Sequence, residues 1–160
     1  MTFDKIKAEE KFDDFLMAMD GQLEWLEEEA SKLGVALSIS PDTPELLESL
    51  FDKMSTSMSK DDIAGLLVVF GRYLGEYVRT TFGGKWELSL DDPKNINFNT
   101  PVIVQHSKFE GLEFSPIRAI RAYHLRKKTG LIRQIVDEDV TPEIPDLSEE
   151  LARENSTKGS

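Results

Sequence analysis

The stretch GRYLGEYVRTTFGGKWEL, from Gly71 to Leu88, decides how the chain folds, because a helical pattern gives way to a strand pattern within it. Its first half continues a helix that we expect over residues 60–82, and Gly71 and Gly75 fall inside that helix. Glycine costs roughly 1 kcal/mol relative to alanine in a helix interior. We therefore expect another element to pack closely over both glycines, where a larger side chain would not fit.

The glycine pair at positions 83 and 84 is typical of a helix end, since glycine readily adopts the left-handed conformation of a C-cap. A phosphate-binding loop would need another glycine five positions before Gly84 and a Ser or Thr after Lys85, and neither is present. Alternating apolar and polar residues from Trp86 onward predict a strand with one buried face. Two further strands are expected over residues 102–105 and 112–114.

Helical patterns precede and follow these strands. Apolar residues at alternating intervals of four and three predict one helix over residues 12–33, with Gly34 at its C-cap. Thr43 before Pro44 predicts the start of a second helix, and Ser115 before Pro116 predicts another that runs to about Lys128 and that residues 131–136 could extend.

This order predicts an α+β fold, with N-terminal helices and a long central helix, a small antiparallel sheet of about three strands, then a C-terminal helix and an acidic tail. Residues 1–136 are expected to form a single domain. Residues 137–160 are acidic and poor in large apolar side chains, so we expect a flexible tail there.

Composition restricts the chemistry that is available to the chain. There is no cysteine and there are only two histidines, which leaves few nucleophiles, bases or metal ligands. The N-terminus is charged and the longest apolar run is too short to cross a bilayer, so a cytoplasmic location is expected. Residues 1–105 carry 10 Lys/Arg against 20 Asp/Glu, hence −10 of the net −11. Such a field disfavours nucleic acid and anionic membranes, and it favours a basic partner or simply solubility.

The candidates for chemistry are weak. His106 could join Glu110 or Glu113 in a metal or acid–base site, but their spacing matches no helical metal motif, and polar residues near strand ends are the simpler interpretation. The basic residues between 118 and 128 are most simply the solvent face of a helix. We predict no catalytic residue, metal site or cofactor.

A binding surface has better candidates. Trp25 is surrounded by carboxylates, and a large aromatic side chain with nearby charges can anchor and steer a basic partner. The alternative is that Trp25 widens the core stripe of its helix. Glu76 lies in YLGEY, where it could belong to a recognition surface or to an intrahelical ladder with Arg72 and Arg79. The predicted partner-binding residues are Glu24, Trp25, Glu27, Glu28, Tyr73 and Glu76.

The segment from Ile63 to Leu90, with YLGEY and then GGKW, is followed by PVIV at 101–104 and by Phe114-Ser-Pro. It resembles small, largely uncharacterised bacterial proteins that share a YLGE…GGxW junction between helix and strand. The resemblance covers about a third of the chain. It implies a stand-alone accessory protein, of the kind that includes immunity proteins of toxin systems, and it brings no catalytic residues.

The function that we expect is therefore non-enzymatic binding of a protein, most concretely an immunity-type inhibitor that neutralises a basic cognate toxin. The alternatives are a regulatory or scaffold module with an unknown partner and an enzyme whose site is invisible in the sequence. The oligomeric state stays open.

Overall fold

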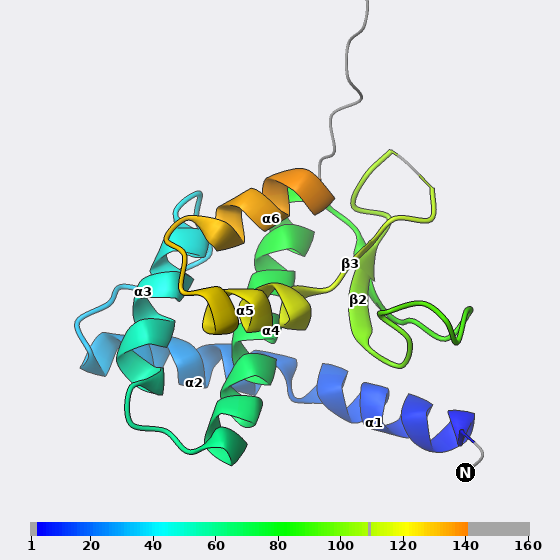
Figure 1. The fold of residues 1–160 in the computed structure, drawn as a ribbon, viewed down its shortest axis with the longest axis horizontal. Coiled ribbons are helices and arrows are strands. Elements are labelled where there is room, and N and C mark those ends of the chain that lie inside the picture. Colours follow the sequence, from blue (N-terminus) through cyan, green and yellow to red (C-terminus); the bar gives the residue numbers. More distant parts are fainter. Residues whose placement is uncertain (1–2, 109, 141–160) are drawn as a thin grey trace, which may run out of the picture.

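The computed structural model describes residues 3–108 and 110–140 (Figure 1). The predicted α+β class is confirmed, with helices packed around a long central helix and a small antiparallel sheet on one side. The elements in chain order are α1 (Lys5–Met17), α2 (Met19–Lys32), α3 (Thr43–Ser55), α4 (Lys60–Phe82), β1 (Lys85–Leu88), β2 (Pro101–Val104), β3 (Glu113–Phe114), α5 (Pro116–Arg126) and α6 (Leu131–Asp139).

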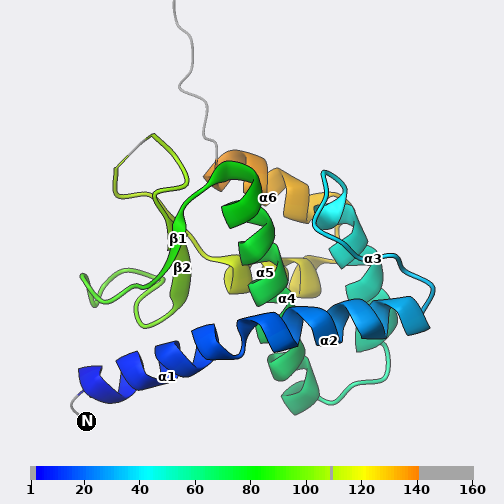
Figure 2. The ribbon, with the colours of Figure 1, turned by 180° about the vertical axis from the view of Figure 1, so that it is seen from behind.

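The central helix α4 begins and ends at the predicted residues. Ser59 caps its N-terminus, where the side-chain Oγ accepts a hydrogen bond from the backbone N–H of Asp62 at 3.3 Å. Gly83 ends the helix with a φ of 93°. α4 contacts α2, α3, α5 and β2, so its apolar side chains are covered from several directions (Figures 1 and 2). This arrangement explains why the helix carries apolar residues on more than one face.

The three strands form a sheet in the order β1-β2-β3, with both pairs antiparallel. Trp86 lies opposite Ile103, and Ile103 lies opposite Phe114. In both ribbon views the sheet lies on one side of α4 and α3 on the other (Figures 1 and 2). Ile103 and Phe114 are buried in the same core as the α4 side chains, so the sheet closes one side of that core.

Gly71 and Gly75 are both places where another element comes close, as predicted. A Cβ atom at Gly75 would lie 2.2 Å from the six-membered ring of Trp86. A Cβ atom at Gly71 would lie 2.5 Å from Cγ1 of Ile117 and 3.0 Å from its Cα. The two glycines therefore let β1 and the start of α5 pack directly on the backbone of α4.

The N-terminal helix differs from the prediction, because it is broken at Ala18 into α1 and α2. The side chain that α1 buries near the break is Phe15, whereas Leu16, which the predicted apolar seam contains, is 37% exposed. Phe15 packs edge-on against Trp86 with ring centroids 5.1 Å apart, and the Arg72 guanidinium lies 4.3 Å from its ring centre. The α2 part of the predicted apolar seam is confirmed, since Met19, Leu26 and Ala30 are buried, whereas in α1 the tertiary contacts of Phe15 replace it.

The C-terminal part of the domain also differs from the prediction. α6 is a separate helix that continues to Asp139, and Val140 after it is fully buried in the core. Residues 137–140 thus belong to the domain, and the predicted boundary at residue 136 lies too early. The rest of the predicted tail, residues 141–160, lies outside the described residues. The carboxylate of Glu48 defines the start of α6, because it accepts hydrogen bonds from the backbone N–H groups of Gly130 and Ile132.

We predict that Gly75→Ala lowers the free energy of unfolding by about 1–3 kcal/mol, because the new methyl group overlaps the Trp86 ring. Gly65→Ala is the matched control in the same helix, since no described atom lies within 4 Å of its added Cβ. The control should gain about 0.5–1 kcal/mol from helix propensity. Urea unfolding of both variants measures the difference, and equal effects of the two substitutions would contradict the close approach.

We also predict that Val140→Ala lowers the free energy of unfolding by about 1–3 kcal/mol, through lost burial and an unfilled cavity. Leu125 is 74% exposed, so Leu125→Ala is an aliphatic control that should change stability by less than about 0.5 kcal/mol. The two melting curves provide the measurement. An unchanged melt for Val140→Ala would place the domain boundary before residue 140 after all.

Candidate functional site

Trp25 lies at the edge of α2, outside the face that the helix buries. The buried residues of α2 are Met19, Leu26 and Ala30, whereas Trp25 is 41% exposed. Its ring borders a groove of about 590 Å³ between α2 and the first half of α4. The wall of the groove is mostly apolar, with Met58, Leu66, Val68 and Val69 among its members. The side chain thus contributes to a surface groove, and it is not among the described apolar side chains that pack against the core.

Carboxylates lie close to Trp25 in the sequence of α2, and another lines the groove from α4. Glu24 and Glu28 are exposed and lie one turn apart on α2, and Asp62 of α4 lines the groove itself. Neither Glu24 nor Glu28 forms a salt bridge within the described part of the chain, while Glu29 pairs with Lys32 at 3.1 Å. The groove therefore combines an apolar wall with one carboxylate, Asp62, and one guanidinium, Arg72, while Glu24 and Glu28 add exposed negative charge on α2.

Glu27 and Tyr73 meet each other on another side of α2. Glu27 follows Trp25 by two positions, which turns it roughly 200° around the helix. There its Oε1 accepts a hydrogen bond of 2.8 Å from the Tyr73 hydroxyl. Tyr73 is fully buried, and burial together with the Glu27 carboxylate raises the pKa of its hydroxyl. The pair joins α2 to α4, so the geometry gives neither residue a free recognition role.

Glu76 is 8% exposed and belongs to the helix-to-strand junction. Its Oε1 accepts a hydrogen bond from the Trp86 indole Nε1 at 2.9 Å, and its Oε2 accepts one from Arg79 Nη2 at 2.8 Å. Its placement on a recognition surface has no support in this geometry. The predicted pairing with Arg79 is present, but Arg72 points elsewhere, toward Phe15. YLGE and GGKW are thus brought together as a structural junction.

Arg72 forms one end of the groove. Its Nε donates to the Phe15 carbonyl at 3.4 Å and its Nη1 donates to Gln22 Oε1 at 3.5 Å. Loss of solvent lowers the pKa of the guanidinium, which nevertheless stays charged. The groove is therefore polar at both ends, with Asp62 toward the start of α4 and Arg72 about ten residues further along the helix.

His106 lies in the interior of the domain. The ring is buried, and burial lowers the pKa of His106, with a partial offset from the nearby carbonyls of Asp139 and Ile103. Glu113 is engaged by Ser89 and Asn95 instead. Among the described residues, no cluster of three or more His, Asp or Glu side chains could hold a metal ion.

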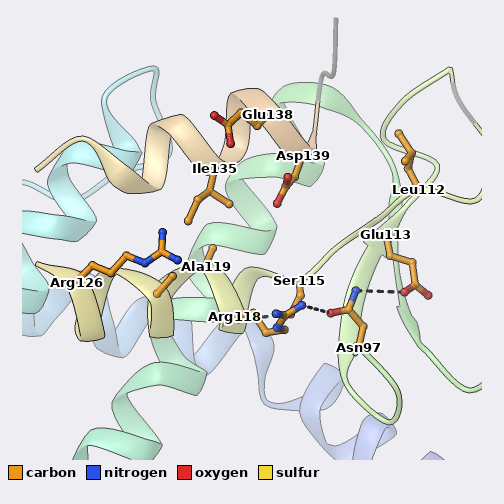
Figure 3. A pocket seen from close by; sticks show the side chains of 11 residues that line it. Asn97, Leu112, Glu113, Ser115, Arg118, Ala119, Arg126, Ile135, Glu138 and Asp139 are labelled. Carbon is orange, nitrogen blue, oxygen red and sulfur yellow. Dashed lines mark hydrogen bonds between the residues drawn. The ribbon is translucent and has the colours of Figure 1, made fainter. Parts of the chain in front are cut away.

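A second hollow, which the sequence did not predict, lies between α5, α6 and β3 (Figure 3). We call it the polar cavity. Its volume is about 460 Å³, and its lining combines two arginines with three carboxylates. The charged members of the lining are Glu113, Arg118, Arg126, Glu138 and Asp139. Only the fold brings these residues together, because they come from three elements that are separate in the sequence.

No family model, curated protein or solved structure matches this chain. The likeness to proteins with a YLGE…GGxW junction therefore stays an expectation. Within the described residues, no helix has both the length and the apolar character that crossing a bilayer requires.

Two buried tyrosines, Tyr73 and Tyr123, should resist ionisation at alkaline pH. Burial and a carboxylate partner raise the pKa of both Tyr73 and Tyr123, whose hydroxyl donates to Asp52 at 2.7 Å. Because the folded-state pKa is raised, their contribution to stability is complete below about pH 10 and is lost as the pH rises further. We expect both hydroxyls to stay protonated above pH about 10 until the protein unfolds.

Ultraviolet titration of tyrosinate, followed together with circular dichroism, measures this resistance. Tyr73→Phe and Tyr123→Phe should each remove one resistant group from the titration. Each should also lower the free energy of unfolding by about 1–2 kcal/mol through the lost bond to a carboxylate. Normal ionisation of all three tyrosines in the folded protein would show that these hydroxyls are solvated.

Proposed function

We propose that this chain is a non-enzymatic binding protein whose partner docks on the groove between α2 and α4. The most concrete form of this proposal is an immunity-type inhibitor that neutralises a cognate bacterial toxin in the cytoplasm. The single observation that carries it is the exposed Trp25 at the wall of an apolar groove, with the exposed carboxylates Glu24 and Glu28 close to it in the sequence of α2. Aromatic anchors supply much of the energy of protein interfaces, while charges outside the interface centre steer the encounter.

The charge distribution of α2 favours a basic partner in the groove. α2 carries five carboxylates and one lysine, and that lysine is paired with Glu29. A partner segment that presents Lys or Arg toward α2 and one large apolar side chain toward Trp25 would complement this surface. A toxin domain that acts on nucleic acid or another anion has the required basic surface. Nucleic acid and anionic membranes would be repelled by the same carboxylates.

A regulatory or scaffold module would use the same groove with a different partner. The two functions differ in what the partner does when it is free. A toxin arrests growth unless the inhibitor occupies it, whereas the partner of a scaffold does not. The experiment that separates the two functions is to co-express this chain with the product of the neighbouring gene and to measure growth, complex formation and binding kinetics.

We predict that the wild-type chain restores growth and that Trp25→Ala does not, with an affinity loss of about 30-fold or more. Reversing Glu24 and Glu28 to Lys should slow association about tenfold or more, and the wild-type association rate should fall as salt increases. Glu27 is left unchanged in this variant, because losing its hydrogen bond to Tyr73 would lower the stability of the domain as well as the affinity for the partner.

The matched control reverses Glu10 and Asp13 to Lys on α1. Both residues are exposed, they lie on α1 and not beside Trp25 on α2, and the change in net charge is the same. This control should bind and protect like the wild type. Equal losses from both double reversals would point to net charge alone, and undiminished protection by Trp25→Ala would reject the groove as the docking site.

A further inference from the structure

One end of the polar cavity lies between the start of α5 and the end of α6 (Figure 3). Arg118 belongs to the first turn of α5, while Glu138 and Asp139 belong to the last turn of α6. A helix is electropositive at its N-terminus and electronegative at its C-terminus. Each of these charges therefore stands at the unfavourable end of its own helix and adds to the sign that is already there. The cavity receives a positive end from α5 and a negative end from α6.

The opposite charges do not neutralise each other across the cavity. Arg118 forms no salt bridge with Glu138 or Asp139 in the described part of the chain, although its charge is felt at the Asp139 carboxyl group. Partial loss of solvent and the neighbouring Glu138 raise the pKa of Asp139, and Arg118 only partly opposes them. Both signs of charge thus remain available to a third molecule.

A relay of hydrogen bonds holds Arg118 in place. Its Nη1 donates to Oδ1 of Asn97 at 3.1 Å, and Nδ2 of Asn97 donates to Glu113 at 3.3 Å (Figure 3). Glu113 accepts two further bonds of 2.7 Å, from Ser89 and Asn95. Asn97 is buried, so this relay is fixed by the fold. A guanidinium carries five N–H donors, and most of those of Arg118 remain for a ligand.

The middle of the cavity is lined by apolar side chains from α5 and α6. Ala119 and Ala122 of α5 have small side chains, and Ile135 points from α6 toward α5 (Figure 3). Arg126 lies beyond them at the far end of the lining. A volume of about 460 Å³ lies within the usual range of small-molecule sites. The cavity therefore offers a polar head site, an apolar strip and a second cation.

We propose that the polar cavity binds a free α-amino acid with a carboxylate side chain. The α-carboxylate would accept hydrogen bonds from Arg118 at the positive end of α5, and the ammonium group would donate to Glu138 and Asp139 at the negative end of α6. The side chain would extend along the alanine strip and place its own carboxylate near Arg126. A zwitterion complements both ends of the cavity at once, which a simple anion or a simple amine cannot do.

The test uses the full chain with L-glutamate and glutarate as probes, because glutarate is L-glutamate without the α-amino group. Isothermal titration calorimetry should give saturable binding of L-glutamate and binding of glutarate that is weaker by about tenfold or more, owing to the missing ammonium bonds. Combined Glu138→Gln and Asp139→Asn should abolish this preference. Arg118→Gln should remove the binding of both probes.

Arg121→Gln is the matched control, since Arg121 is exposed on α5 and does not line the cavity. It should leave the affinity for L-glutamate unchanged. No saturable binding of L-glutamate, or equal affinities for L-glutamate and glutarate, would overturn the proposal. Because these two outcomes need only the wild-type chain, a folding defect in Arg118→Gln cannot hide them. Trp25→Ala should keep the ligand, which separates this site from the proposed docking groove.

Discussion

The contact on which the rest of the structure depends is Trp86 lying on Gly75, with its indole N–H donating to Glu76. The glycine removes the one atom that would keep the ring away from the α4 backbone. The carboxylate satisfies the polar atom of a side chain that is otherwise packed among apolar groups. This contact fixes β1 against α4, and through Trp86 it also fixes the end of α1, where Phe15 packs on the same ring.

Both proposed sites inherit their geometry from α4. The docking groove uses its first half together with α2, and the polar cavity uses α5, which approaches α4 through Ile117 over Gly71. The two sites occupy different parts of the domain and use opposite kinds of wall, one apolar with acidic surroundings and one polar with both signs of charge. A macromolecule and a small solute could therefore be bound by the same chain through separate residues.

The sequence predicted the fold where the signals are local. Ser59, Ser115 and Gly83 are capping residues that act within one turn, so the limits of α4 and the start of α5 could be read directly. The break at Ala18 and the buried Val140 depend on contacts with distant residues, which no local period reveals. Trp25 could be selected from the sequence as a large aromatic residue among acidic ones, and its role in binding stays a prediction. The polar cavity could not be selected, because three elements have to be assembled first.

The capping of α6 limits which parts of this domain can be moved to another protein. α6 has nine residues and no side-chain N-cap of its own; the Glu48 carboxylate of α3, 82 positions before Gly130, supplies the acceptors for its first N–H groups. So short a helix is marginal in isolation. The helix therefore depends on α3, a remote part of the chain, for its stability. Transplanting the cavity wall that carries Asp139 into another scaffold would require α3 to be moved with it.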